Sequence, residues 1–184
     1  MKDPASQGPR RVCVKLYAGE TGIGDQVFVP IFQEWIRDQA LDGLVLFDVA
    51  DYAHVPDSPG IVLVTYETSF AMDRSDGRFG LLAQRRVARE GDSEAMVAST
   101  LEQTLRVAAK LEGDPRLAGK LEFDRSTIRV ESNDRLRAPN TDEGYRVFEP
   151  VLKRAVAAVL PGKSPQVKRI ANDPRDRLTV DVKA

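Results

Sequence analysis

The residues best suited to chemistry lie in the segment FDVADYAHVPDSPG, residues 47–60. This segment holds the only histidine of the chain, His54, together with Asp48, Asp51 and Asp57. Carboxylate oxygens without cysteine suit Mg²⁺ or Mn²⁺, and one imidazole favours Mn²⁺. One straight strand cannot form such a site, because at ~3.3 Å per residue Asp48 and His54 would lie ~20 Å apart. A metal site here therefore needs side chains from other segments.

The topology that we expect can supply those side chains. The pattern predicts strands over 11–18 and 44–52 with a helix between them, and a right-handed crossover would make these strands parallel. Their carboxyl ends would then share the edge at which open α/β sheets bind ligands. That edge would gather Glu20, Asp25, Asp51, His54 and Asp57. The candidate metal ligands are Asp25, Asp51, His54 and Asp57.

A purely structural interpretation of these residues stays open. Asp25 would then cap the helix and Asp51 would end the strand. Asp57 would stabilise a turn between two prolines. No recognised ligand spacing decides between the two interpretations.

Other polar groups are candidates for binding a ligand rather than a metal. The loop AGETGIGD (18–25) has three glycines between a strand and a helix, but it matches neither phosphate-binding glycine motif, and a tight turn explains it better. Arginines in 78–86 could clamp a carboxylate or phosphate, or they could protect an edge strand. The polar loop 132–141 could line the same groove. The candidate ligand-binding residues are Glu20, Tyr52, Arg78, Arg86, Asn133 and Arg135.

The first half of the chain must position most of these side chains. A core-facing helix is predicted from the apolar residues between Phe28 and Ile36, with Pro30 in its first turn. Further strands are expected over 61–72 and 78–88, joined by a turn at Asp76-Gly77 into a hairpin. The unbroken apolar run over 61–64 favours a central strand that is covered on both faces.

The second half begins after a long helix over 92–112, which Asp92 is expected to cap. A strand or hairpin follows over 120–132, and then a helix whose capping box would be Asn140 and Glu143. A closing hairpin is predicted over 166–172 and 177–183.

Two windows of the sequence are similar to each other. GDQVFVPIFQEWI (24–36) aligns without gaps to GYRVFEPVLKRAV (144–156), with Gly, Val, Phe and Pro identical. This similarity suggests two β-α-β-β halves, 11–91 and 120–184, joined by the helix 92–112. The alternative is two amphipathic helices that happen to accept a proline near their starts.

We therefore predict a single α+β domain over 11–184, with a disordered lead-in at 1–10. Its sheet would be mixed but largely antiparallel, with about seven strands and three main helices. The paired plan is similar in architecture to the gyrase-inhibitor-like small-molecule-binding domains, which implies a ligand groove. The segments HVPDSPGIVL, GRFGLL and NDRLRAPNT together resemble a family of uncharacterised bacterial proteins, and this resemblance implies no site residues.

Composition narrows the function classes. Residues 18–72 carry nine acidic side chains against one basic side chain, which argues against a broad phosphate-binding face and hence against nucleic acid. No apolar run is long enough to span a bilayer, and the single Cys13 lies in an apolar stretch that favours burial. We expect a soluble, cytoplasmic protein without a membrane partner. Motifs for a serine triad or a zinc site are absent from the sequence.

The function that the sequence favours is a non-catalytic ligand-binding or protein-interaction module without a cofactor. It would use a groove between the halves or the acidic face to bind a small molecule or a protein. The alternative is an enzyme that depends on Mg²⁺ or Mn²⁺ and uses the carboxylate-rich edge of the sheet. A homodimer formed through exposed strand edges is a further hypothesis.

Overall fold

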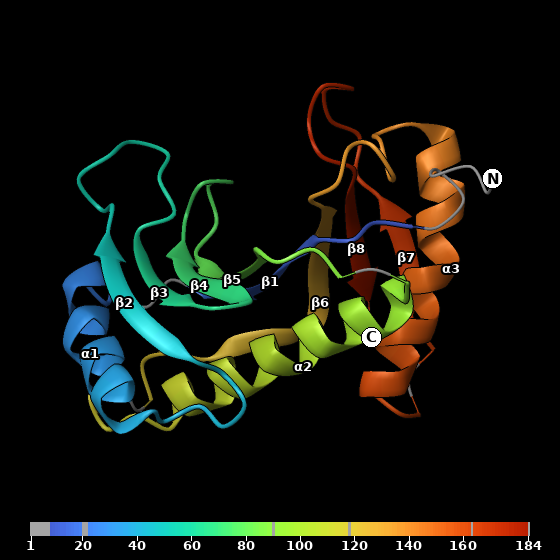
Figure 1. The fold of residues 1–184 in the computed structure, drawn as a ribbon. Helices are drawn as coiled ribbons and strands as arrows, with labels where there is room; N and C mark the ends of the chain where they lie inside the picture. Colours follow the sequence, from blue (N-terminus) through green and yellow to red (C-terminus); the bar gives the residue numbers. More distant parts are fainter. Residues whose placement is uncertain (1–7, 20–21, 90, 118, 163, 184) are drawn as a thin grey trace.

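The computed structural model describes residues 8–19, 22–89, 91–117, 119–162 and 164–183. Within these ranges the chain forms three α-helices and one sheet of eight strands (Figure 1). The strands are β1 (Val12–Ala18), β2 (Leu46–Asp51), β3 (Ile61–Thr65), β4 (Thr68–Asp73), β5 (Gly80–Arg85), β6 (Phe123–Ser132), β7 (Gln166–Arg169) and β8 (Thr179–Lys183). The helices are α1 (Phe28–Asp38), α2 (Ser93–Glu112) and α3 (Asp142–Val159), and a short 3-10 helix, η2 (Asp25–Val27), precedes α1. The predicted α+β class is confirmed, with eight strands where about seven were expected.

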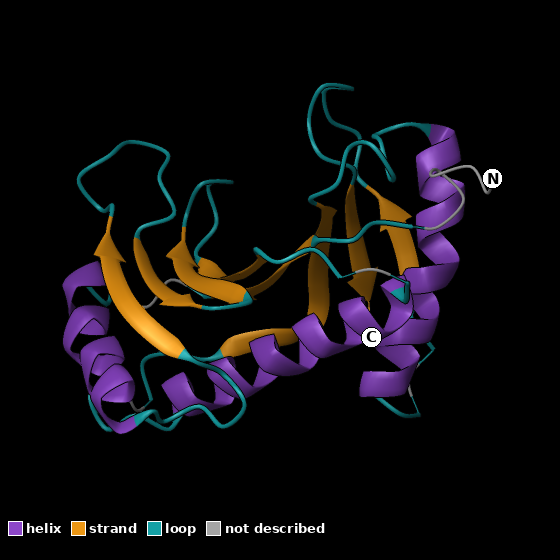
Figure 2. Ribbon diagram, viewed as in Figure 1, coloured by secondary structure: helices purple, strands orange, loops and turns teal. Residues whose placement is uncertain are grey.

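All neighbouring strands are antiparallel, in the order β2-β3-β4-β5-β1-β6-β8-β7. Helix α1 packs on β2 and β3, α2 packs on β1 and β5, and α3 packs on α2 and β7. Figure 2 shows the helices along the outer side of a bent sheet and connecting loops rising on the opposite side. We call the side of the sheet without helices the uncovered face. On β1 it carries Cys13, Lys15 and Tyr17.

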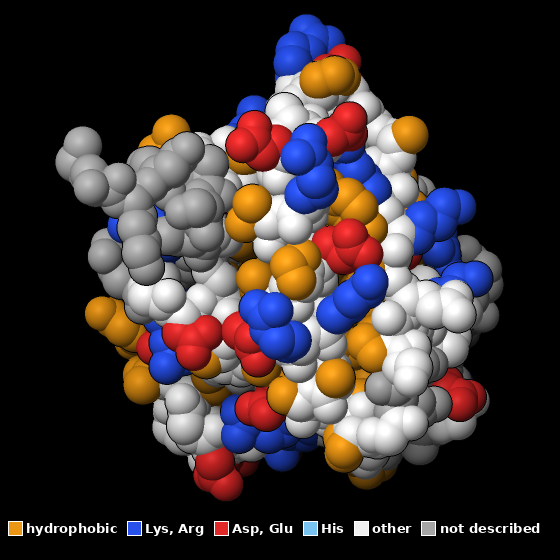
Figure 3. Space-filling view, turned by 90° about the vertical axis from the view of Figure 1, so that its right-hand side faces the viewer, with side chains coloured by type: hydrophobic (Ala, Val, Ile, Leu, Met, Phe, Trp, Pro, Cys, Tyr) orange, Lys and Arg blue, Asp and Glu red, His pale blue; other side chains and the backbone are white. Residues whose placement is uncertain are grey.

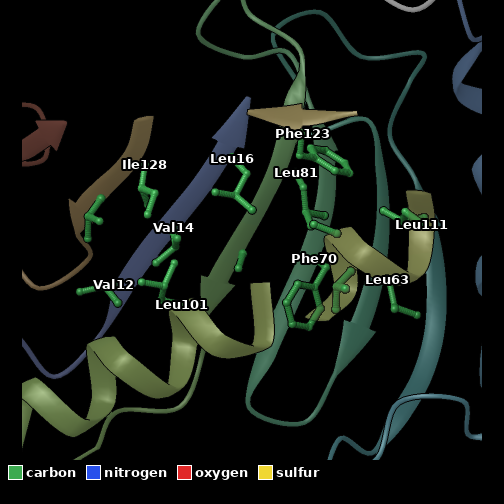
Figure 4. Close-up of a cluster of buried hydrophobic side chains, with 14 of the residues drawn as sticks. Val12, Val14, Leu16, Leu63, Phe70, Leu81, Leu101, Leu111, Phe123 and Ile128 are labelled. Carbon is green, nitrogen blue, oxygen red and sulfur yellow. The ribbon is translucent and has the colours of Figure 1, made fainter. Parts of the chain in front are cut away.

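Alternation along the strands builds a continuous apolar core on the helix side. Val12, Val14 and Leu16 of β1 are fully buried, and Figure 4 shows them on the side of the sheet that faces Leu101 of α2. The apolar side of α1 completes this core at one end, with Phe28, Ile31, Phe32 and Trp35 buried. Pro30 lies in the first turn of α1, as predicted, where its missing N–H costs no helical hydrogen bond.

The helix starts follow the rules for N-caps, with one correction. Asp92 caps α2, as predicted, and its carboxylate accepts a hydrogen bond from the N–H of Ala95 at 2.9 Å. For α3 the capping box with Asn140 was wrong, because Thr141 is the N-cap and accepts from the N–H of Gly144 at 3.0 Å. Asn140 instead donates to the side chain of Asn172, and so it ties the start of α3 to the closing hairpin.

The segment 61–72, predicted as one strand, forms two. The Thr65 hydroxyl donates to the carbonyl of Thr68 at 2.5 Å and accepts its N–H at 3.3 Å, which closes a tight turn between β3 and β4. Strand β3 is second from the edge of the sheet, and helices cover only one of its faces. The interpretation of 61–64 as a strand covered on both faces was therefore wrong.

The arginine-rich strand was also misplaced by the sequence. Strand β5 lies between β4 and β1 rather than at an edge, so its arginines do not protect an edge. The hairpin of β4 and β5 around Asp76-Gly77 and the closing hairpin of β7 and β8 both form as predicted.

The two halves of the chain share a pairing plan. In each half the last strand pairs with the first, β5 with β1 and β8 with β6, and β1 and β6 pair antiparallel in the middle of the sheet. The second half is β-α-β-β, whereas the first has two additional strands. The two similar windows also occupy different positions in their helices, since Pro30 is in the first turn of α1 and Pro150 is inside α3. Duplication stays a prediction.

The start of the described chain contacts the body of the domain. Gly8 and Pro9 are buried, and the Arg10 N–H donates to the carboxylate of Asp134 at 3.1 Å. Residues 1–7 of the predicted lead-in lie outside the described residues. In the part of the chain that the structure describes, no helix has the length and apolar character needed to cross a bilayer.

The end of the molecule that bears α3 is an ordinary solvated surface. Figure 3 shows Lys and Arg side chains interspersed there with Asp and Glu and with scattered hydrophobic side chains. Lys153 pairs with Glu149 along α3, and Arg154 pairs with Glu94 of α2. Such exposed pairs contribute little to stability.

Candidate ligand-binding site

The uncovered face of β2 to β5 is apolar where a solvent-facing strand is normally polar. The pairing register places Ala50, Val62, Ala71 and Leu82 in one row across the four strands. Val64 of β3 points to the same side, and no helix covers any of them. The apolar run over 61–64 therefore serves two surfaces, since Ile61 and Leu63 face α1 and the core while Val62 and Val64 face this surface.

These side chains form the floor of a hollow of about 450 Å³. Tyr52 and Pro59, from the loop between β2 and β3, form a wall at one end, and Arg86 lies at the other end after β5. We call this the β2–β5 hollow; its full lining is Ala50, Tyr52, Pro59, Val62, Val64, Ser69, Ala71, Leu82, Gln84 and Arg86. A mostly apolar pocket of this size with a few polar groups is typical of small-molecule sites.

Most hydrogen-bonding capacity of the polar side chains around the hollow is not used by the described residues. Among the hydrogen bonds of the described residues, the side chains of Tyr52, Ser69 and Gln84 have no partner. Arg86 donates from Nη1 to the carbonyl of Thr65 at 3.2 Å, and it forms no ion pair within the described ranges. Most of the five N–H donors of its guanidinium therefore remain free for a ligand.

The middle of the uncovered face, on β1, is built differently. Lys15 is 3% exposed, and its ammonium donates to Asp73 at 2.6 Å, to Asp76 and to the carbonyl of Arg78 at 2.9 Å. Asp73 is itself buried. The loop between β4 and β5 thus folds over β1 and neutralises a buried cation with two carboxylates.

Tyr17 joins the same cluster. Its hydroxyl donates to Asp76 at 2.9 Å, and the Arg78 guanidinium lies 3.5 Å from the centre of its ring. Burial and the hydrogen bond to Asp76 raise the pKa of Tyr17 above its ordinary value. Burial alone would raise the pKa of Asp76, but the hydrogen bonds from Lys15 and Tyr17 outweigh it and lower that pKa. Arg78, a predicted ligand-binding residue, is therefore engaged in stacking on Tyr17.

A second, more polar hollow of about 370 Å³ lies on the other half of the sheet. Arg135 lines it together with Arg129, Glu131 and Arg177. Asn133 does not line either hollow; its backbone N–H pairs with the carbonyl of Arg11. The structure thus brings Tyr52 and Arg86 together in the β2–β5 hollow but separates them from Arg135, while Glu20 lies outside the described residues.

Cys13, between the two hollows, is buried as predicted. Burial raises the pKa of its thiol to about 12. The guanidinium of Arg177 lies 3.3 Å from its sulfur and 3.4 Å from the carboxylate of Glu131. A protonated thiol at neutral pH is a poor nucleophile and a poor metal ligand.

Two of the four proposed metal ligands, Asp25 and Asp57, line one hollow near the end of β2. The crossover predicted that β1 and β2 run parallel. They are not neighbours, but the three antiparallel strands between them leave both running in the same direction. Asp25 and Asp57 line one small hollow of about 250 Å³, in which Arg74 pairs with Asp25 at 3.4 Å.

The other two proposed ligands have different surroundings. Asp51 accepts hydrogen bonds from the side chain of Gln26 and from the N–H of Ala53, both at 2.9 Å, and these bonds lower its pKa. His54 is exposed in the loop that follows. Within the described ranges, no three His, Cys, Asp or Glu side chains come together as a metal site. The Mg²⁺ or Mn²⁺ site stays a prediction.

The exposed edge of β2 is partly blocked by its own side chains. Gln39 bonds both the N–H and the carbonyl of Leu46, at 3.4 and 3.3 Å. The Asp48 carboxylate accepts the N–H of Val49 at 2.8 Å, and the pairing register shifts between Leu46 and Asp48. A homodimer formed by pairing through β2 would have to displace these bonds, since side chains and bulges of this kind protect edge strands.

Comparisons with known proteins add no further constraint. No family model matches the chain, and the searches of curated proteins and of solved structures find no significant match. The similarity to gyrase-inhibitor-like domains stays an expectation from the sequence, and the first half departs from their plan by two additional strands.

Proposed function

We propose that this protein is a non-catalytic module that binds a small molecule in the β2–β5 hollow. The observation that carries the proposal is a row of apolar side chains on the uncovered face. Around it lie Tyr52, Ser69 and Gln84, whose side chains have no partner among the described residues, and Arg86, whose guanidinium uses one donor. Burying such a row under a ligand stabilises the complex by roughly 25 cal/mol per Å² of apolar surface removed from water.

The lining of the hollow supports binding rather than catalysis. It contains no carboxylate, imidazole, thiol or amine, which are the usual acids, bases and nucleophiles of enzymes. Ser69 and Tyr52 supply hydroxyls, but the lining has no base to activate them. The proposal includes two expectations from the sequence, a cytoplasmic location and no nucleic-acid partner.

Titration with phenylnaphthylamine, a neutral dye that fluoresces in apolar surroundings, tests the proposal. We expect saturable binding to the full chain. The substitution Ala71→Phe places a ring over the floor of the hollow, and it should weaken binding by at least about tenfold, equivalent to about 1.4 kcal/mol.

The matched control is Ala157→Phe on the exposed side of α3, which should leave the dye affinity unchanged. Circular dichroism checks that both variants fold, and Val64→Asp provides a second way to spoil the hollow if Ala71→Phe does not fold. Absence of saturable binding, or equal affinity in Ala71→Phe and the wild type, would overturn the proposal.

A further inference from the structure

Arg86 gives the β2–β5 hollow a charge that its lining does not compensate. The hollow contains one guanidinium and no carboxylate. The acids on adjoining segments, Asp48, Asp51 and Glu67, do not line the hollow, and Glu67 pairs with Arg85 at 3.0 Å. A cationic ligand would meet this positive charge without a counter-ion, whereas an anionic ligand would neutralise it.

The orientation of Arg86 is fixed in part by the sheet. Its Nη1 donates to the carbonyl of Thr65 on β3, so the side chain crosses the end of the sheet at the margin of the hollow. The guanidinium keeps donors free, and a planar fork of this kind matches a carboxylate with two parallel hydrogen bonds. Because one of its donors is already bonded to the backbone, the Arg86 side chain loses less conformational entropy when a ligand binds.

Hydrogen-bonding groups without charge also line the hollow. Ser69 and Gln84 lie in register with each other on the side of the apolar row that is nearer to Arg86, and Tyr52 is in the wall at the opposite end. These groups can bind neutral oxygens or nitrogens of a ligand, but they do not select for charge. Selection by charge therefore depends on Arg86.

We infer that the hollow takes an anionic amphiphile, a small molecule with an apolar body and one carboxylate or similar anionic group. The apolar body covers the row Ala50, Val62, Ala71 and Leu82, and the anionic group pairs with Arg86. This inference rests on the proposed function and adds to it the chemical class of the ligand.

Two dyes with the same aromatic skeleton test the inference. Phenylnaphthylamine is neutral, and anilinonaphthalene sulfonate adds one sulfonate to it. In the wild type we expect the sulfonate to bind about tenfold more tightly than the neutral dye, equivalent to about 1.4 kcal/mol, since hydrogen bonds between charged groups are stronger than those between neutral groups. This preference should shrink as salt is raised, because ions screen exposed charges.

The decisive variant is Arg86→Gln, with Arg89→Gln as its matched control three residues along the chain. Arg86→Gln should abolish the preference for the sulfonate and leave the affinity for the neutral dye unchanged. Arg89→Gln should retain the preference, because Arg89 is exposed and does not line the hollow.

The outcomes separate the two proposals. Binding of both dyes with equal affinity, or a preference that survives in Arg86→Gln, would overturn the inference and leave the binding module standing. Failure of the neutral dye to bind would overturn the proposed function itself. A preference that is lost equally in Arg86→Gln and Arg89→Gln would show general attraction by the surface and would also contradict the inference.

Discussion

The uncovered face differs between β1 and the strands β2 to β5 in how its polar side chains are paired. Over β1 the face carries Lys15, Tyr17 and the acids of the β4–β5 loop, and their charged groups are bound to one another. Over β2 to β5 it carries an apolar floor, next to which Tyr52, Ser69 and Gln84 have no side-chain partner among the described residues and Arg86 uses one donor. Polar side chains that the fold buries pair with one another, whereas those left with unused donors and acceptors are available to a ligand.

The difference has a simple physical origin. The loop after β4 folds back over β1, so Lys15 loses its water and needs Asp73 and Asp76 as partners. The loop after β2 rises beside the sheet and supplies only Tyr52 and Pro59 as a wall of the hollow. The hollow thus remains open, while the surface of β1 is closed.

The largest change in the free energy of unfolding is expected for Lys15→Met, which removes the ion pairs on β1. This change leaves Asp73 as a buried carboxylate without its cation, and loss of one partner of a buried pair typically costs about 3–5 kcal/mol. Denaturant unfolding measures the change. Arg37→Met is the control, because its pair with Asp38 is exposed and its loss should leave the stability nearly unchanged. Similar values for the two variants would contradict a structural role for the Lys15 cluster.

A smaller effect is expected from Asp76→Asn, and it should depend on pH. The folded state lowers the pKa of Asp76, so its carboxylate stabilises the protein at pH values above the ordinary value of about 3.9. We expect the wild type to exceed the variant by about 1–2 kcal/mol at pH 7, after allowing for partial exposure of the side chain. As pH falls through the lowered pKa the difference should vanish. A constant difference between pH 7 and pH 2 would contradict this assignment.

The smallest effect concerns the sheet edge with Asp51 and His54. Since three potential ligands do not converge within the described residues, we expect millimolar Mn²⁺, Mg²⁺ or Ca²⁺ to leave the Tm of the wild type unchanged. A cation present at 100 times its Kd would stabilise the folded state by about 2.7 kcal/mol. A shift in Tm that His54→Ala or Asp51→Asn abolishes would restore the metal-dependent alternative and make this edge the place for chemistry.

Sequence reasoning found part of the candidate site. Tyr52 and Arg86, both predicted as ligand-binding residues, line the hollow. The floor was missed because the run over 61–64 was interpreted as a strand covered on both faces. The signal was present in the sequence, since Val62 and Val64 alternate with Ile61 and Leu63, but a pattern cannot show whether a second layer of structure exists.

Local sequence patterns predict most elements of this protein, although they merge β3 and β4 into one strand. Periodicity placed the helices, Asp92 began α2, and Asp76-Gly77 closed a hairpin, because each of these depends on residues close in the chain. Three features depend on the tertiary structure: β5 is central, Lys15 and Asp73 meet across 58 positions, and Arg86 lines the same hollow as Val62 and Ala71. Strand order brings distant residues together, and it depends on which faces the helices bury, a choice that local spacing does not encode.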